Sequence, residues 1–315
     1  MNRKLTDTSI YISHAGRAER YWDGKSVKSK YSAQEDSRAD IDLHKLLQKY
    51  SIKGFEFGNW VNNNDRYDRA LACQKALYHL AWIMKTQNLG MNGQLGIAFG
   101  ARGMGGGAVA HFEPKQNMIN LTKMNGHLSL AHEYGHALDW NFGRFIDQNK
   151  NYNYLTGGRS TAQTLPDNTG GQFRHYANAI VDTIKQTESY ARTGTSDYLS
   201  SRVEIFARAF EQYVCWCIKS ASRVGANTNY LCKSWSHYTS DRAYLTEKDF
   251  KLVLPLFTKL VGEFGKYCNG RSKVTAMPYP VVKSAAKKSK PIKIATPKRT
   301  TKKAAAKKSV AKRKR

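Results

Sequence analysis

The sequence predicts an α+β fold in which a small sheet packs on helices, and its regular patterns support this. Short segments of strand-like composition alternate with helical ones over residues 41–122, whereas from residue 128 onward the regular segments are all helical. Hydrophobic residues make up 41% of the chain, which is ordinary for a globular protein. We expect a partly ordered polar arm over residues 1–40, a folded domain over residues 41–270, and a disordered Lys/Arg-rich tail over residues 271–315.

Local patterns place the first elements in chain order. Residues 41–50 have the apolar spacing of a short helix, and residues 55–61 alternate apolar and polar side chains as a strand does. A longer helix is expected from about residue 66 to residue 86, with Asn64 and Asp65 as its capping residues. Strands of an antiparallel-rich sheet are then expected over residues 95–100, 108–112 and 118–122.

A glycine-rich segment and a set of helices complete the expected domain. Residues 102–107 lack the spacing of a phosphate-binding loop, so we interpret them as a hairpin connection between two strands. Gly143 is expected to end the helix that begins near residue 128. Further helices are expected over residues 173–190, 202–214 and 247–267.

The helix that begins near residue 128 carries the strongest functional pattern of the chain. His132 and His136 are four residues apart, so both imidazoles lie on one helix face and can reach one tetrahedral Zn²⁺ ion. Glu133 projects beside them, where its carboxylate can take a proton from the attacking water molecule. The segment His132-Glu133-Tyr134-Gly135-His136 is therefore the H-E-x-x-H arrangement of a zinc hydrolase.

Two histidines leave a catalytic zinc ion one protein ligand short, and Glu204 is the preferred third ligand. It begins a strongly helical segment, as the glutamate does in the gluzincin arrangement, and Ala207 provides the small side chain needed where the two helices cross. Glu211, two turns further on, is the alternative, either as the metal ligand or as a residue that supports the ligands. On residue type alone, the candidates for stabilising an oxyanion are His175, Tyr176, Tyr198, Arg208 and Tyr213.

The charge of the chain indicates a polyanionic partner. Lys and Arg number 51 against 24 Asp and Glu, which gives a formal net charge of +27. Residues 283–315 hold fifteen of these basic side chains and no acidic one, and the other 36 still outnumber the acidic ones. Such a tail binds nucleic acid without sequence specificity through counterion release, with a solvated spacer as the alternative. The expected nucleic-acid-binding residues are Lys302, Lys303, Lys307, Lys308, Lys312, Arg313, Lys314 and Arg315.

Cysteine usage and the lack of apolar runs bear on location. Five cysteines without a framework spacing argue against a disulfide-built secreted protein, and we interpret them as buried thiols. The N-terminal residues contain no apolar segment of the kind found in secretory signals, and no apolar run is long enough to span a membrane. We therefore expect a cytoplasmic protein with no membrane partner.

Six motifs in a fixed order resemble a known family. They are FGNWV (57–61), LGIAFGARG (95–103), AHFEP (110–114), INLTK (119–123), HEYGHALD (132–139) and EIFARAFE (204–211). Together they resemble the first type of large polyvalent protein-associated domain, a zincin-like domain of phage and plasmid proteins, over roughly residues 50–220. The resemblance implies a zinc metallopeptidase-like domain in a mobile-element protein, either associated with the virion or injected with DNA into a host cell. Tyr134 stands where this family more often has Trp.

Two functions are consistent with these observations. The leading one is a zinc-dependent metallopeptidase of a phage or other mobile element, with a gluzincin-type mechanism, which acts on a protein or peptide near nucleic acid. The alternative is a DNA-binding or virion-packaged structural protein with a non-catalytic zincin core. The intact Glu133 favours the enzyme, and the basic tail favours the binding protein.

Overall fold

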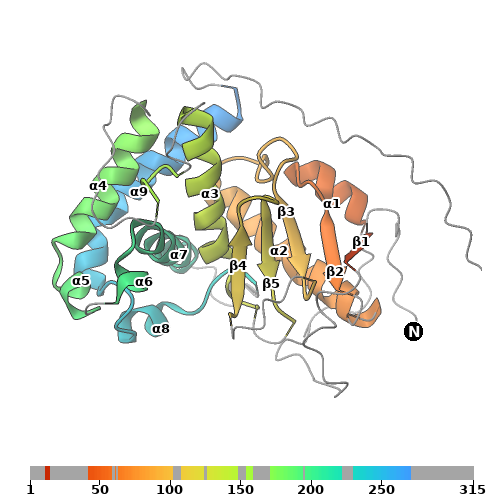
Figure 1. The fold of residues 1–315 in the computed structure, drawn as a ribbon, viewed down its shortest axis with the longest axis horizontal. Helices are drawn as coiled ribbons and strands as arrows, with labels where there is room; N and C mark the ends of the chain where they lie inside the picture. The colour runs from red at the N-terminus through yellow and green to blue at the C-terminus, as the bar shows by residue number, and fades with distance from the viewer. Residues whose placement is uncertain are drawn as a thin grey trace, which may run out of the picture. The chain divides into compact units, whose positions relative to one another are not determined.

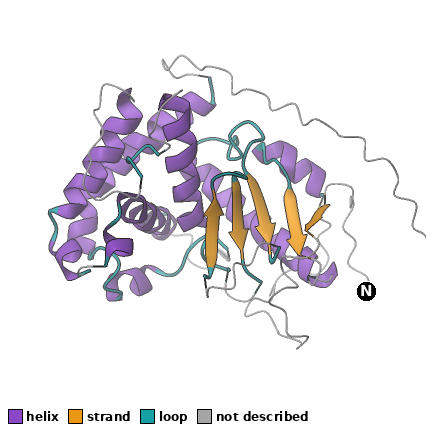
Figure 2. Cartoon of the chain, viewed as in Figure 1, coloured by secondary structure: helices purple, strands orange, loops and turns teal. Residues whose placement is uncertain are grey.

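The computed structural model describes residues 11–14, 42–58, 61, 63–101, 108–123, 126–147, 154–158, 171–193, 196–221 and 230–270. All of them lie in the first of the two units into which the chain divides, Met1–Met277. The basic tail, and most of the polar arm, therefore fall outside the described residues. The described part is a mixed α and β fold that is rich in helix, as the sequence predicts (Figure 2).

Five short strands form one sheet in the order β1-β2-β3-β5-β4 (Figure 1). They are β1 (Tyr11–His14), β2 (Phe55–Gly58), β3 (Gly96–Phe99), β4 (Ala110–Glu113) and β5 (Met118–Leu121). Among these strands, β4 at the edge pairs antiparallel with β5, and the other three pairings are parallel. The prediction of an antiparallel-rich sheet is therefore wrong. Strand β1 lies in the N-terminal arm (residues 1–40), where the sequence predicts no strand.

The connections between strands explain their directions. The long helix α2 (Asn63–Met84) lies between β2 and β3 and carries the chain back, so that these two strands pair in parallel. Only residues 114–117 join β4 to β5, and so short a connection produces an antiparallel pair. Because β5 lies between β3 and β4, these two strands do not pair with each other. Residues 102–107, which the sequence predicts to be a hairpin connection, lie outside the described residues.

The helices pack around this sheet and against one another. Helix α3 (Leu130–Asp147) contacts β4, β5 and α7 (Arg202–Ser220). Helices α4 (Gly171–Lys185) and α9 (Glu247–Cys268) pack together, and both contact α7, while α1 (Leu43–Tyr50) packs on α2 (Figure 1). The remaining helices are α5 (Glu188–Arg192), α6 (Asp197–Ser200) and α8 (Trp235–Ser240).

One hydrophobic core joins the sheet to the helices. In the sheet, Phe57 stacks on Phe99 with ring centroids 5.4 Å apart. Between α7 and α9, Phe257 packs against both Phe206 and Phe210. Helix α3 contacts the sheet and α7 alike, so both parts of this core fix its position.

The five cysteines are free thiols. Cys73, Cys215 and Cys232 are buried, as the sequence predicts, whereas Cys217 and Cys268 are only half-buried. Among the described helices, none combines the length and the apolar character that crossing a membrane requires.

The sequence predicts that helix α3 ends at Gly143. In the structure the helix continues to Asp147. A Cβ atom at position 143 would lie 2.3 Å from the carbonyl carbon of Tyr154 and 2.4 Å from the backbone nitrogen of Leu155. The glycine therefore allows residues 154–155 to pass close over α3 and does not end the helix.

Replacing Gly143 with alanine is expected to lower the free energy of unfolding by about 1–3 kcal/mol, because the added methyl group meets backbone atoms that cannot rotate away. Gly262→Ala, in α9, is the matched control. A Cβ atom there meets nothing within 4 Å, so alanine is expected to raise stability by up to about 1 kcal/mol through its helix propensity. Urea denaturation measures both, and equal effects at the two positions would contradict the packing role of Gly143.

Candidate metal centre

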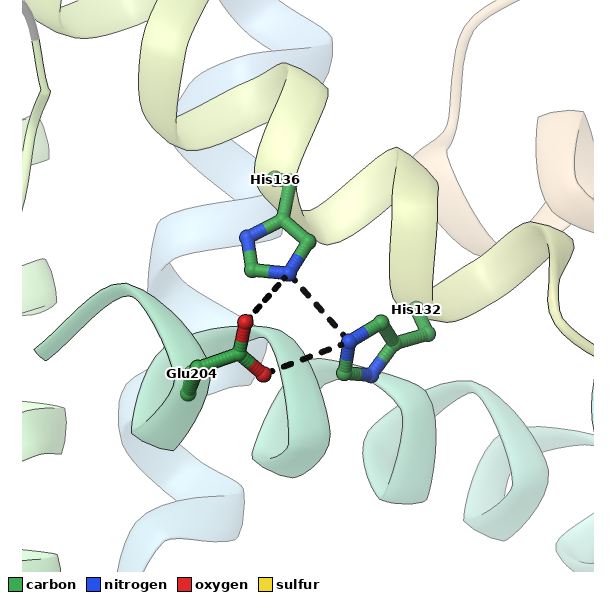
Figure 3. A group of neighbouring side chains, drawn as sticks. All are labelled: His132, His136 and Glu204. Carbon is green, nitrogen blue, oxygen red and sulfur yellow. Dashed lines mark hydrogen bonds and ion pairs between the residues drawn. The ribbon is translucent and has the colours of Figure 1, made fainter. Parts of the chain in front are cut away.

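Helix α3 presents His132 and His136 from successive turns of one face, as the four-residue spacing predicts (Figure 3). Their Nε2 atoms are 3.2 Å apart, and the two rings lie at 82° to each other. The first two N–H groups of α3 donate hydrogen bonds to the backbone carbonyl oxygens of Tyr230 and Leu231. The start of the histidine helix is therefore anchored to the segment that precedes α8.

Glu204 reaches both histidines from the first turn of α7. Its Oε1 lies 3.3 Å from Nε2 of His136, and its Oε2 lies 3.5 Å from Nε2 of His132 (Figure 3). The Glu204 side chain is buried, and apart from the 3.5 Å contact with His132 its Oε2 has no hydrogen-bond partner among the described residues. Because a buried carboxylate oxygen usually accepts a hydrogen bond, this oxygen fits the position of a ligand to a cation.

The close approach of α3 to α7 sets these distances. A Cβ atom on Gly135 would lie 3.0 Å from Cα and 3.4 Å from Cβ of Ala207, so almost no side chain separates the two helices at this point. Ala207 therefore has the position that the sequence predicts for a small residue at the crossing. Glu204 lies about one turn before Ala207, and the two histidines lie on either side of Gly135, so the crossing brings the three side chains together.

A buried hydrogen-bonded bridge also links the two helices. Asp139 of α3 accepts hydrogen bonds from the backbone N–H and the hydroxyl group of Thr156, at 2.8 and 2.7 Å. The carbonyl oxygen of Thr156 in turn accepts a hydrogen bond from Nε of Arg202, the first residue of α7, at 2.5 Å. Since all three residues are buried, this bridge holds the two helices in a fixed relation away from solvent.

His132, His136 and Glu204 form a group that could hold a metal ion, with one ligand atom from each within 4.8 Å of the others. Burial alone lowers the pKa of His132, but its contacts with Glu204 and Glu211 raise that pKa to about 10. Burial alone raises the pKa of Glu204, but the two histidines hold it well below its usual range. Without a metal ion, a proton on His132 therefore supplies the positive charge that the carboxylates require.

Glu211 contacts the opposite side of His132, with its Oε2 3.5 Å from Nδ1. The hydroxyl groups of Tyr238 and Tyr244 donate hydrogen bonds to its Oε1 and Oε2, at 2.6 and 2.8 Å. A carboxylate at the second nitrogen of a ligating histidine fixes the orientation of the ring. The two glutamates left open by the sequence thus differ in position, because Glu204 faces Nε2 of both histidines and Glu211 faces Nδ1 of one.

The two tyrosines that hold Glu211 have no signal in the sequence. Tyr238 and Tyr244 follow Glu211 by 27 and 33 residues, so only tertiary folding brings them to it. Helix α8, which carries Tyr238, has six residues and is too short for a periodic pattern to reveal it.

Glu133 is buried, with 5% of its surface exposed, next to the histidines in the first turns of α3. Burial raises the pKa of its carboxyl group, and the neighbouring histidines partly offset this effect. A carboxylate with a raised pKa in such a place is suited to accept a proton and to release it again.

Tyr198 is the oxyanion candidate that the structure places beside these carboxylates. It lies on α6 and is 63% exposed, and the partial burial of its hydroxyl group, with the charges of Glu204 and Glu133, raises its pKa. Arg208, in contrast, donates hydrogen bonds to three backbone carbonyl groups, and Tyr213 stacks on a phenylalanine of the core. The other two candidates, His175 and Tyr176, lie on α4.

Residues 191–267 match the family model of large polyvalent protein-associated domain 1. This is the family that the six sequence motifs resemble, so the resemblance is confirmed over these residues. The matched segment of the domain covers α6, α7, α8 and nearly all of α9, and it contains Glu204 and Glu211 but neither histidine. No curated protein and no solved structure was found to match the chain. The eight tail residues assigned to nucleic acid lie outside the described residues.

Replacing Glu204 with alanine is expected to abolish stoichiometric metal binding, because it removes the carboxylate that faces both Nε2 atoms. Glu211→Gln is expected to keep the stoichiometry but to weaken the affinity about 10- to 100-fold, as loss of an orienting carboxylate does. Competition with a chromophoric chelator measures both effects. Glu263→Gln, on α9, is the control without effect, and equal losses at Glu204 and Glu211 would contradict their different roles.

The apparent metal affinity is expected to rise about tenfold per pH unit between pH 6.5 and pH 9, because the ion must displace the proton from His132. The sign follows from the raised pKa of about 10: His132 is protonated throughout this range, and protons compete less as the pH rises. Calorimetry in buffers of different ionisation enthalpy should show about one proton released per ion bound. An affinity that does not change with pH would mean that His132 is neutral in the metal-free protein.

Proposed function

We propose that this protein is a zinc-dependent peptidase with a zincin-like fold. The observation that carries the proposal is the convergence of His132, His136 and Glu204 next to a buried Glu133. The ligand atoms of the first three residues are 3.2–3.5 Å apart. Bond lengths of 2.0–2.1 Å in a tetrahedral zinc site place neighbouring ligands about 3.3 Å apart, so the described geometry suits this ion.

The donor set supports zinc over the common alternatives. Two imidazoles and one carboxylate are ligands of catalytic zinc sites, whereas Mg²⁺ and Ca²⁺ take oxygen ligands almost throughout. Three protein ligands leave one position of a tetrahedral ion open, as a catalytic site requires. Glu211, held by two tyrosines at Nδ1 of His132, provides the orienting contact that such a ligand usually has.

The mechanism that fits these residues is of the gluzincin type. A zinc ion held here supplies Lewis acidity for the attack of water on a peptide carbonyl group. Glu133 accepts a proton from the attacking water on its carboxylate and passes it to the leaving amine, and its raised pKa favours transfer in both directions. Tyr198 keeps its hydroxyl proton because its own pKa is raised, so it can donate a hydrogen bond to the developing oxyanion.

The family match supports a place for this protein among phage-associated proteins. Residues 191–267 supply the carboxylate half of the centre, and the histidines come from α3, ahead of that segment. Helices α3 and α7 cross at Gly135, and α3 carries the two histidines while α7 carries Glu204. This arrangement is consistent with a zincin-like core.

The second part of the proposal is that the protein binds nucleic acid. The charge of residues 283–315 supports non-specific binding of nucleic acid through the basic tail, which would hold the peptidase near DNA or RNA. The same charge favours one alternative function, a DNA-binding or virion-packaged structural protein with a non-catalytic core. A buried carboxylate beside the histidines that is not itself one of the three candidate ligands favours the enzyme, because a purely structural site has no use for a further buried acid.

The decisive experiment compares zinc-loaded wild-type protein with Glu133→Gln on a broad peptide library. The substitution is expected to lower kcat about 100- to 10,000-fold while the zinc content stays the same, because it removes the proton acceptor and keeps the ligands. Glu188→Gln, an exposed glutamate of α5, is the matched control with full activity.

Cleavage that persists in Glu133→Gln would exclude the proposed mechanism. If zinc-loaded wild-type protein cleaves no peptide of the library, the non-catalytic alternative is preferred. Tyr198→Phe refines the result, since an oxyanion donor affects kcat more than KM, and unchanged kcat would remove Tyr198 from the mechanism.

A further inference from the structure

Residues of helices α1 and α2, which pack against each other, line a surface cavity of about 390 Å³. Its lining includes Lys45 and Lys49 of α1 and Lys75 and Tyr78 of α2. The volume is in the range of sites that hold small ligands or one unit of a larger one. No lining residue belongs to the metal-ligand group, so the two sites are separate.

The cavity has an excess of positive charge. Lys45 and Lys49 are one turn apart on α1 and both are exposed, and Lys75 lies half-buried on α2. The carboxylate in the lining is that of Asp42, which pairs with Lys45 at 3.4 Å. Three ammonium groups against one carboxylate make the cavity attractive to an anion with several charges.

Two large aromatic side chains extend the same face of α2. Tyr78 and Trp82 are 52% and 43% exposed, although aromatic side chains of this size are usually covered. They follow Lys75 by three and seven residues, so all three side chains lie on one face of the helix. On the α1 side of the cavity, Nζ of Lys49 lies 5.3 Å from the ring centroid of Tyr50, which is itself buried.

We propose that the surface formed by Lys45, Lys49, Lys75, Tyr78 and Trp82 binds single-stranded nucleic acid. Lysines that contact phosphates, together with exposed rings on which bases stack, are the combination that binds single strands without sequence preference. A duplex hides its bases in the stack, and an acidic peptide has no flat groups for the two rings. None of these five residues belongs to the metal-ligand group or to residues 283–315.

Fluorescence anisotropy with a labelled fifteen-nucleotide oligothymidine tests the proposal on the full chain. Measurements at about 0.5 M salt weaken the purely electrostatic contribution of the tail and leave stacking in place. Tyr78→Ala and Trp82→Ala are each expected to raise Kd about 5- to 150-fold, the range measured for loss of one stacked base. Both variants keep the tail, so the difference reports the surface. Leu252→Ala, a 55% exposed residue of α9, is the control without effect.

The lysines are tested by the salt dependence of binding. Each phosphate contact to a single strand contributes about 0.7 to the slope of log Kd against log salt, so replacing Lys45, Lys49 and Lys75 together with alanine should reduce the slope by about 2. The control variant replaces three lysines of α9 and is expected to show a smaller change. These control positions are Lys248, Lys251 and Lys259.

Several outcomes would overturn the proposal. Unchanged affinity in Tyr78→Ala and Trp82→Ala would mean that the tail alone binds the oligonucleotide. If the two alanine variants lose as much affinity for a hairpin duplex as for the single strand, the rings do not stack on bases. If polyglutamate displaces the oligonucleotide, the partner is an acidic protein. Tyr78→Phe and Trp82→Phe keep an aromatic face and should retain the affinity; if they lose as much as the alanine variants at unchanged thermal stability, stacking is excluded.

Discussion

The close crossing of α3 and α7 is the constraint on which the candidate metal centre depends. The crossing requires the missing side chain of Gly135 and the small one of Ala207, since a larger group would force the helices apart. The rest of the fold supports it from both sides: β4 and β5 contact α3, and α4 and α9 contact α7. The buried bridge from Asp139 through Thr156 to Arg202 adds a polar link between the two helices. Because ligand distances at a metal ion tolerate only about 0.2 Å of change, the supports matter as much as the ligands.

The sequence predicts those parts of the candidate site in which the relevant spacing is local. The two histidines and Glu133 are fixed relative to one another by a single helix, so their pattern is visible in five residues. The choice between Glu204 and Glu211 is different, because both lie on roughly one face of α7 and both reach His132. Only the rotation of α7 against α3 separates them, and no local pattern encodes that rotation. The tyrosines that hold Glu211 were missed for the same reason.

The fold shows the same division between local and non-local information. Apolar periodicity revealed most helices and four of the five strands, because each pattern is contained in its own segment. It carries no information on strand direction, so the parallel pairings of β2, β3 and β5 were not predicted. Gly143 is a second example. A glycine near the end of a helical pattern is compatible with a helix stop or with the close passage of another segment. Here the second applies, because the backbone of Tyr154 and Leu155 passes close to Gly143.

The separation of the candidate ligands along the chain affects the stability of the folded protein. His136 and Glu204 are 68 residues apart, and they belong to different helices. An ion bound between them acts as a reversible cross-link that closes a long loop, as a disulfide does. Such a closure restricts the unfolded chain most when the loop is long. Gain or loss of the ion would then shift the balance between folded and unfolded chain, and hence the susceptibility of this protein to degradation.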